Sequence, residues 1–176
     1  MTTSFSLRTL SRDDILHHLP ALSDILASCV NGGASVSFML PFGAHTATTF
    51  WQHTADSVAA GERIVLVALD ADERPVGTVQ LITRQPENQP HRADVAKLLV
   101  HQNARRQGIA NALMAELEQT ARRQGKTVLV LDTATGSGAE QFYVRCGWEK
   151  VGEIPRYALM PDGEMTATSL FYKFLP

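Results

Sequence analysis

Apolar residues recur at helical spacing in the first third of the chain and predict two helices. The first helix follows Ser11, a residue suited to cap a helix, and has acidic residues in its first turn. Pro20 falls within this helical pattern, so we expect it to kink the helix or divide it in two before Asn-Gly-Gly at residues 31–33 ends it. The second helix is expected at residues 45–60, and a short extended segment at residues 5–7 precedes both.

Runs rich in β-branched residues follow and alternate with two further helical patterns. Strands are predicted at residues 63–69, 76–83, 93–100, 127–131, 149–159 and 165–174, and helices at residues 108–124 and 139–146. Residues 127–131 read TVLVL, a nearly continuous apolar run that indicates a strand covered on both faces. With the preceding strand and helix it makes a βαβ unit, so we expect parallel pairing with residues 93–100. This order of elements predicts an α/β domain.

The composition is that of an ordinary soluble globular protein, with 44% hydrophobic and 19% charged residues. At about 150 residues per domain, a chain of 176 residues is expected to form one domain over residues 1–176. Its 16 basic and 18 acidic residues give a net charge of −2, which lacks the basic character of a nucleic-acid-binding protein. An anionic ligand must therefore find local positive charge.

Two cysteines, Cys29 and Cys146, are too few for a disulfide framework, and the six histidines show no metal-ligand spacing with carboxylates. We therefore expect no metal. Charged residues among the first twenty argue against an export signal. The uncharged stretch at residues 25–55 is interrupted by Asn, Gly and Pro, so we do not expect it to span a membrane. A cytoplasmic protein is the simplest expectation.

The loop between the strand at residues 93–100 and the next helix carries Arg105, Arg106 and Gly108. Backbone N–H groups at a helix N-terminus, with two guanidinium groups beside them, form a site for a phosphate or pyrophosphate. The alternative is that these are solvated loop charges and a turn glycine. Two commoner phosphate loops do not fit the sequence. The Gly-Lys-Thr at 125–127 runs from a helix into a strand, and the Gly-Ser-Gly at 136–138 lacks the third glycine of a dinucleotide fingerprint.

Residues 105–110, RRQGIA, resemble the R/Q-x-x-G-x-G/A motif of the GCN5-related N-acetyltransferases, and they lie between a strand and a helix as in that family. Residues 142–148, FYVRCGW, resemble the end of the family's last helix, and the order of elements covers the whole chain. The resemblance implies a single-domain α/β fold with a mixed, mainly antiparallel sheet flanked by helices.

Three further segments, residues 32–39, 93–100 and 161–163, resemble the tabtoxin-resistance acetyltransferases, which acetylate the amine of a β-lactam amino-acid toxin. This sequence departs from those enzymes in having Pro20 inside the first helix and Asp94 where a glutamate is expected.

The family resemblance implies acetyl-CoA as co-substrate, with its pyrophosphate on the N–H groups of residues 106–111. It also implies that pantetheine pairs with residues 98–100 like an added strand, beside a bulge that leaves a backbone N–H free as an oxyanion donor. The sequence alone does not show this bulge. The expected cofactor-binding residues are Leu98, Leu99, Val100, Arg105, Arg106, Gln107, Gly108, Ile109, Ala110 and Asn111.

Three residues are candidates for the chemistry of transfer. The resemblance gives Tyr143 the role of general acid toward the CoA sulfur, the alternative being a core aromatic. A primary ammonium group has a pKa of about 10.4, so a general base is useful near neutral pH. Asp94 is expected on the same strand face as Leu98 and could act as base through water, while Asp132 could hold the amine. Either aspartate could instead only accept backbone N–H bonds.

The uncharged connection between the first two helices is expected to cover the acceptor, with Ser35, Phe38 and Met39 as lining residues. The alternative is a glycine-rich connection without a ligand. The predicted function is acetyl transfer to a small-molecule amine, such as an amino-acid-like toxin or antibiotic. Acetylation of a protein N-terminus or lysine, and a non-catalytic acyl-CoA sensor, are the rival functions. Neither nucleic acid nor membrane is an expected partner, and a homodimer is left open.

Overall fold

The computed structural model describes residues 4–176 of the chain. The helices are α1 (Arg12–His17), α2 (Leu19–Asn31), α3 (Ala44–Ala59), α4 (Ile109–Arg123) and α5 (Ala139–Arg145), with a short 3-10 turn, η1 (Gln102–Ala104). The strands are β1 (Ser6–Leu10), β2 (Arg63–Leu69), β3 (Pro75–Ile82), β4 (Arg92–Val100), β5 (Val128–Ala134), β6 (Glu149–Leu159) and β7 (Met165–Phe174). Within this described part, no helix is both long and apolar enough to cross a membrane.

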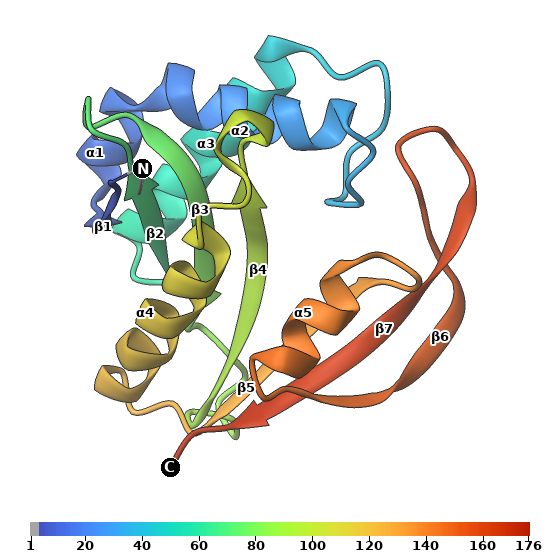
Figure 1. The fold of residues 1–176 in the computed structure, drawn as a ribbon. Helices are drawn as coiled ribbons and strands as arrows, with labels where there is room; N and C mark the ends of the chain where they lie inside the picture. Colours follow the sequence, from blue (N-terminus) through green and yellow to red (C-terminus); the bar gives the residue numbers. More distant parts are fainter. Residues whose placement is uncertain (1–3) are drawn as a thin grey trace.

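Among the described residues, seven strands form one sheet in the order β1-β2-β3-β4-β5-β7-β6 (Figure 1). All neighbouring strands pair antiparallel except β4 and β5, which pair in parallel. The predicted fold class, a mixed and mainly antiparallel sheet flanked by helices, is confirmed. The predicted division at Pro20 is also found, because α1 ends at His17 and α2 begins at Leu19 with the proline in its first turn.

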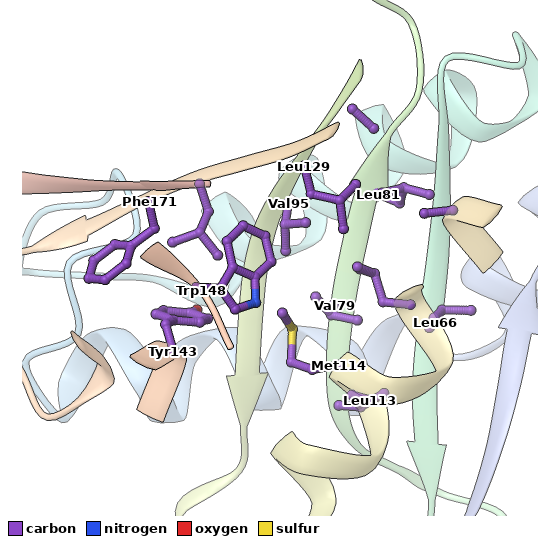
Figure 2. Close-up of a cluster of buried hydrophobic side chains, with 14 of the residues drawn as sticks. Leu66, Val79, Leu81, Val95, Leu113, Met114, Leu129, Tyr143, Trp148 and Phe171 are labelled. Atoms are coloured by element: carbon purple, nitrogen blue, oxygen red, sulfur yellow. The ribbon is translucent and has the colours of Figure 1, made fainter. Parts of the chain in front are cut away.

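Helices cover both faces of the sheet, and the sheet separates the core into two clusters. On the α4 face, α4 and α5 pack against alternate residues of the central strands, and Figure 2 shows Met114 of α4 and Tyr143 of α5 in this cluster. On the α3 face, α1, α2 and α3 bury the intervening residues. Trp51 of α3 is fully buried there and donates a hydrogen bond from its indole N–H to the Leu22 carbonyl of α2, 3.0 Å away.

Strands β4 and β5 pair only over a short stretch, Arg92–Asp94 with Val128–Val130, and beyond it no pairing joins them. The expectation that β5 is covered on both faces is wrong. Leu129 and Leu131 are buried on the α4 face, whereas Val128 and Val130 are only half-buried. The helices of the α3 face contact β2, β3 and β4, so they leave the corresponding face of β5 more open.

A β-bulge interrupts β4 near its middle. Thr78 of β3 pairs with Leu99 and Gln80 pairs with Ala96, so β4 holds one extra residue between them. Lys97 lies in the bulge with a φ of +56°. As a result Val95 and Leu98 both pack against the α4 cluster, whereas residues three apart in a regular strand point to opposite faces. The prediction that Asp94 and Leu98 share a face is therefore wrong, because the extra residue inverts the alternation between them.

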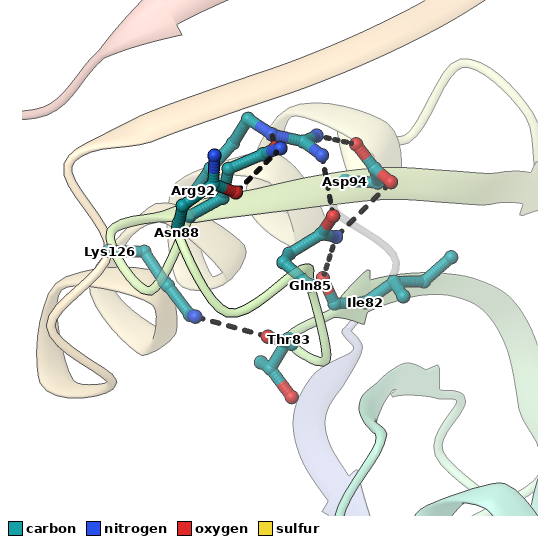
Figure 3. Close-up of polar contacts among 8 residues, drawn as sticks. Ile82, Thr83, Gln85, Asn88, Arg92, Asp94 and Lys126 are labelled. Carbon is teal, nitrogen blue, oxygen red and sulfur yellow. Dashed lines mark hydrogen bonds and ion pairs between the residues drawn. The ribbon is translucent and has the colours of Figure 1, made fainter.

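The loop before β4 is tied to the end of α4 by a buried lysine (Figure 3). Lys126 is 8% exposed, and its ammonium donates to the carbonyls of Thr83, at 3.0 Å, and Pro90, at 2.8 Å. Thr83 is half-buried and Pro90 is exposed, and the carbonyls of both residues share this one donor.

The Lys126→Met variant is expected to lose about 1–3 kcal/mol of unfolding free energy in urea titration, since it leaves both carbonyls without their donor. Lys150→Met is the control, because Lys150 forms partly exposed ion pairs with Glu140 and Glu153 that contribute about 0–1 kcal/mol. Equal midpoints for Lys126→Met and the wild type would contradict the prediction.

Candidate active site

A groove opens where β4 and β5 diverge, and it consists of two connected hollows. One has a volume of about 360 Å³ and is walled by β4, β5, the connection between α2 and α3, and the β6–β7 hairpin. The other has a volume of about 530 Å³ and lies at the start of α4, opposite α5. The residues that line both hollows are Leu98, Val100, Arg105, Ala139 and Tyr143. The two hollows therefore form one path through the sheet.

The N-terminus of α4 points into the second hollow without a side-chain cap or an acid in its first turn. Gly108 precedes the helix with a φ of +79°, and a Cβ built there meets no atom within 4 Å. Free N–H groups, the positive end of the helix and nearby guanidinium groups together suit a phosphate. This hollow fits the pyrophosphate end of acetyl-CoA.

Most of the predicted cofactor residues meet in this second hollow, namely Leu98, Val100, Arg105, Arg106, Gly108, Ile109, Ala110 and Asn111. Leu99 lines the first hollow instead. Gln107 lines neither, and contributes to a separate hollow beside His101. Arg145 of α5 adds a third guanidinium group to the second hollow, which the sequence analysis missed. Its spacing of three residues from Phe142 on a helix is the signal that could have revealed it.

Within the described part of the chain, the edge of β4 that faces β5 has no strand partner beyond Asp94. Backbone groups of residues 95–100 are thus left for a ligand that pairs like an added strand. One carbonyl is already engaged: Val100 accepts from the Cys29 thiol at 3.5 Å and from the Arg105 guanidinium at 3.4 Å. Burial raises the pKa of the Cys29 thiol, so this cysteine is a packed neutral group.

Tyr143 lies at the junction of the two hollows and is 8% exposed. Burial raises the pKa of its phenol to about 12, and the neighbouring Cys146 and Asp132 add to the shift. The ring centroid lies 6.0 Å from both Trp148 and Phe171 (Figure 2). The ring therefore belongs to the core while the residue also lines the groove, and the phenol stays protonated at neutral pH.

The structure does not bring the two candidate aspartates together. Asp132 lines the first hollow, and its carboxylate accepts a 2.7 Å hydrogen bond from the Thr168 hydroxyl of β7. Asp94 lines neither hollow. It forms an ion pair with Arg92 at 2.5 Å and accepts from the Gln85 amide at 3.2 Å (Figure 3). Only Asp132 is placed to meet an acceptor in the groove.

The connection between α2 and α3 covers the first hollow, as expected, but only one of its three candidate residues lines it. Ser35 does so. Phe38 packs against Phe42 and Phe50, with ring centroids 5.1 and 5.5 Å apart, and Met39 is 42% exposed. The Leu40 N–H donates to the Pro161 carbonyl, 3.0 Å away, which joins this connection to the β6–β7 turn.

The first hollow also contains residues that the sequence analysis did not single out: Lys97 of β4, Tyr157 of β6 and Thr168 of β7. No local sequence pattern marks them, because the bulge in β4 and the long β6–β7 hairpin bring them to the groove. Within residues 4–176, no three His, Cys, Asp or Glu side chains gather as a metal site would require.

Comparison with known proteins is consistent with this geometry. The model of the Acetyltransferase (GNAT) family matches residues 34–148. N-acetyltransferase 8B of Rattus norvegicus is 37% identical over 86 residues, which cover 48% of this chain and 39% of that protein. N-acetyltransferase 8F1 of the same species is 32% identical over 106 residues, covering 60% and 41%. The match thus spans about two fifths of the length of these curated relatives.

Solved structures share the fold across nearly the whole chain. An N-acetyltransferase from Staphylococcus aureus Mu50 has a TM-score of 0.79 and 16% identity, covering 99% of this chain and 100% of that one. The protein yncA from Salmonella typhimurium, solved with its cofactor acetyl-CoA, has a TM-score of 0.78 and 16% identity, covering 99% and 95%. At such identities the likeness concerns the fold alone.

Proposed function

This chain belongs to the acetyltransferase (GNAT) family and carries an acetyl-CoA-dependent N-acetyltransferase domain, and we propose that it acetylates the primary amine of a small molecule. An amino-acid-like toxin or antibiotic, as in tabtoxin resistance, is the proposed acceptor class. The observation that carries the proposal is the continuous groove, with a phosphate-binding helix end in one hollow and Asp132 in the other. The cytoplasmic location and the homodimer remain predictions.

In this proposal the chain's own residues bind and orient the co-substrate. The N-terminus of α4 and the guanidinium groups of Arg105, Arg106 and Arg145 hold the phosphates. The unpaired edge of β4 aligns the pantetheine arm toward Tyr143. When bound, acetyl-CoA supplies the activated acetyl thioester.

Proton movement completes the proposed mechanism. The Asp132 carboxylate attracts the acceptor's ammonium group into the first hollow and takes a proton from it, so that a neutral amine is available. The Thr168 hydroxyl holds that carboxylate in place. The neutral amine then attacks the acetyl carbon, and the bond from that carbon to sulfur breaks. Tyr143 donates its phenolic proton to the leaving sulfur, and its raised pKa keeps that proton available at neutral pH. The nitrogen gives up a second proton, which restores the phenol, and Asp132 releases its proton to solvent.

The test is release of free thiol from acetyl-CoA over a panel of primary amines that includes amino acids, amino sugars and lysine-containing peptides. Release with small amines supports the proposal. Release with peptides alone would favour the protein acetyltransferase. A chain that binds acetyl-CoA but releases no thiol with any amine would be a sensor.

Gly108→Asp is expected to weaken acetyl-CoA binding at least about tenfold, which is about 1.4 kcal/mol. Gly108 lines the second hollow and an added Cβ meets open space, so the new carboxylate is expected to fit there and to repel the pyrophosphate. Calorimetry with acetyl-CoA measures the effect.

Gly108→Asn is the matched control, since asparagine has the shape of aspartate without its charge and tolerates the left-handed backbone. Equal losses in both variants would assign the effect to strain, and unchanged affinity of a folded Gly108→Asp protein would refute the pyrophosphate assignment.

A further inference from the structure

Lys97 is set apart from the other three lysines of the chain by its surroundings. Among the described residues, its ammonium group has no ion pair and no hydrogen bond. The other lysines are all engaged: Lys126 by two carbonyls, Lys150 by two glutamates, and Lys173 by Glu118 and the Cys146 carbonyl. Half-burial of an ammonium group that has neither an ion pair nor a hydrogen bond is costly, so its retention points to a ligand.

The bulge in β4 determines where this ammonium group lies. Lys97 adopts a φ of +56°, and its Nζ lies 5.9 Å from the ring centroid of Phe50 on α3. The side chain is therefore on the α3 face of the sheet and lines the first hollow, but not the second one at α4. Burial lowers the pKa of Lys97, with Arg63 adding to the shift and Asp132 opposing it. A nearby anion would stabilise its charged form.

Three charged side chains line the first hollow, namely Lys97, Arg105 and Asp132. Arg105 also lines the second hollow, where the co-substrate's phosphates are expected. Lys97 and Asp132 thus remain as one positive and one negative group, on opposite walls formed by β4 and β5. They form no ion pair with each other, so a ligand can bind between them. Such a pair complements a molecule that carries both an ammonium and an anionic group.

We propose that the acceptor is an amino acid or a close analogue, whose carboxylate binds Lys97 while its amine binds Asp132. This inference rests on the proposed function, because it assigns the acceptor of the same groove. It makes Lys97 a specificity-determining residue. It also distinguishes this acceptor from simple amines, amino sugars and internal lysine residues of proteins, which lack a carboxylate near the amine.

The test uses matched acceptors that differ only in the anionic group. L-methionine, glycine, β-alanine and γ-aminobutyrate are each compared with their carboxamides, by calorimetric binding to the CoA-bound protein and by kcat/KM from thiol release. For at least one pair, the wild type is expected to bind the acid about tenfold more tightly than the amide. Lys97→Met is expected to remove that preference, and Lys97→Arg to retain most of it. Lys150→Met, outside the groove, should behave as the wild type.

The two readouts separate the inference from the proposed function. If acids bind in preference to amides and Lys97→Met removes the preference, the inferred carboxylate site at Lys97 stands even when no thiol is released. The proposed function alone would then fail. If amines are acetylated but no acid is preferred to its amide, or if Lys97→Met keeps the preference, the inference is overturned. Calorimetry with acetyl-CoA and the melting temperature verify that Lys97→Met is folded.

Discussion

The Tyr143→Phe variant is expected to lose about 100-fold in kcat, the lower end of what a positioned general acid contributes. The substitution removes only the hydroxyl, so the ring keeps its contacts with Trp148 and Phe171 in the core. Steady-state rates of thiol release measure the loss. The melting temperature and the affinity for acetyl-CoA should change little, because neither depends on the phenolic proton.

The pH dependence gives a second measure of the same role. A general acid works while protonated, and the pKa of about 12 keeps the Tyr143 phenol protonated well above neutral pH. The kcat of the wild type should therefore show no decline attributable to this residue between about pH 7 and pH 10.

Tyr172→Phe is the control for Tyr143→Phe. Tyr172 donates its hydroxyl proton to Glu149 at 2.6 Å and lines neither hollow, so the same chemical change there should leave kcat unaffected. A Tyr143→Phe protein that turns over at the wild-type rate would leave this tyrosine a role in packing only.

Periodicity predicted most of the elements because each is stabilised by a pattern within its own segment. The strand predicted at residues 63–69 is found at Arg63–Leu69, and the one predicted at 165–174 is found at Met165–Phe174. The capping signal of Ser11 is equally local, since its hydroxyl accepts from the Asp14 N–H three residues on. Features of this kind need no knowledge of distant residues.

The bulge could not be predicted in the same way, because it is a mismatch in length between β4 and its partner β3. The segment ADVAKLLV reads as an uninterrupted strand, and only the pairing of Gln80 with Ala96 and Thr78 with Leu99 shows the extra residue. The two errors that concern residues of β4 follow from it. Asp94 is turned away from the face of Leu98, and Lys97 lines the first hollow although no sequence pattern predicted it there.

The acceptor connection was difficult for a different reason. Phe38 is drawn into an aromatic cluster with Phe42 and Phe50, so its burial depends on how the connection packs against α3. Met39 is left exposed beside it. Adjacent apolar residues in an irregular segment carry no period that tells which of them points inward.

Asp132→Asn is expected to lower kcat/KM for the amine by about 100-fold, because it removes both the charge that attracts the ammonium group and the proton acceptor. The Thr168 hydroxyl can still hydrogen-bond to the amide oxygen, so the fold around position 132 should persist. The measurement is kcat/KM against pH with a single amine, and the acidic limb of the profile should shift or flatten.

Asp94→Asn is the matched control. The Asp94 carboxylate is engaged by Arg92 and Gln85 outside both hollows, so its loss should leave the limb in place. A limb altered only by Asp94→Asn would make that residue the base, acting through water from beyond the groove wall. Full activity in both variants would make both aspartates structural.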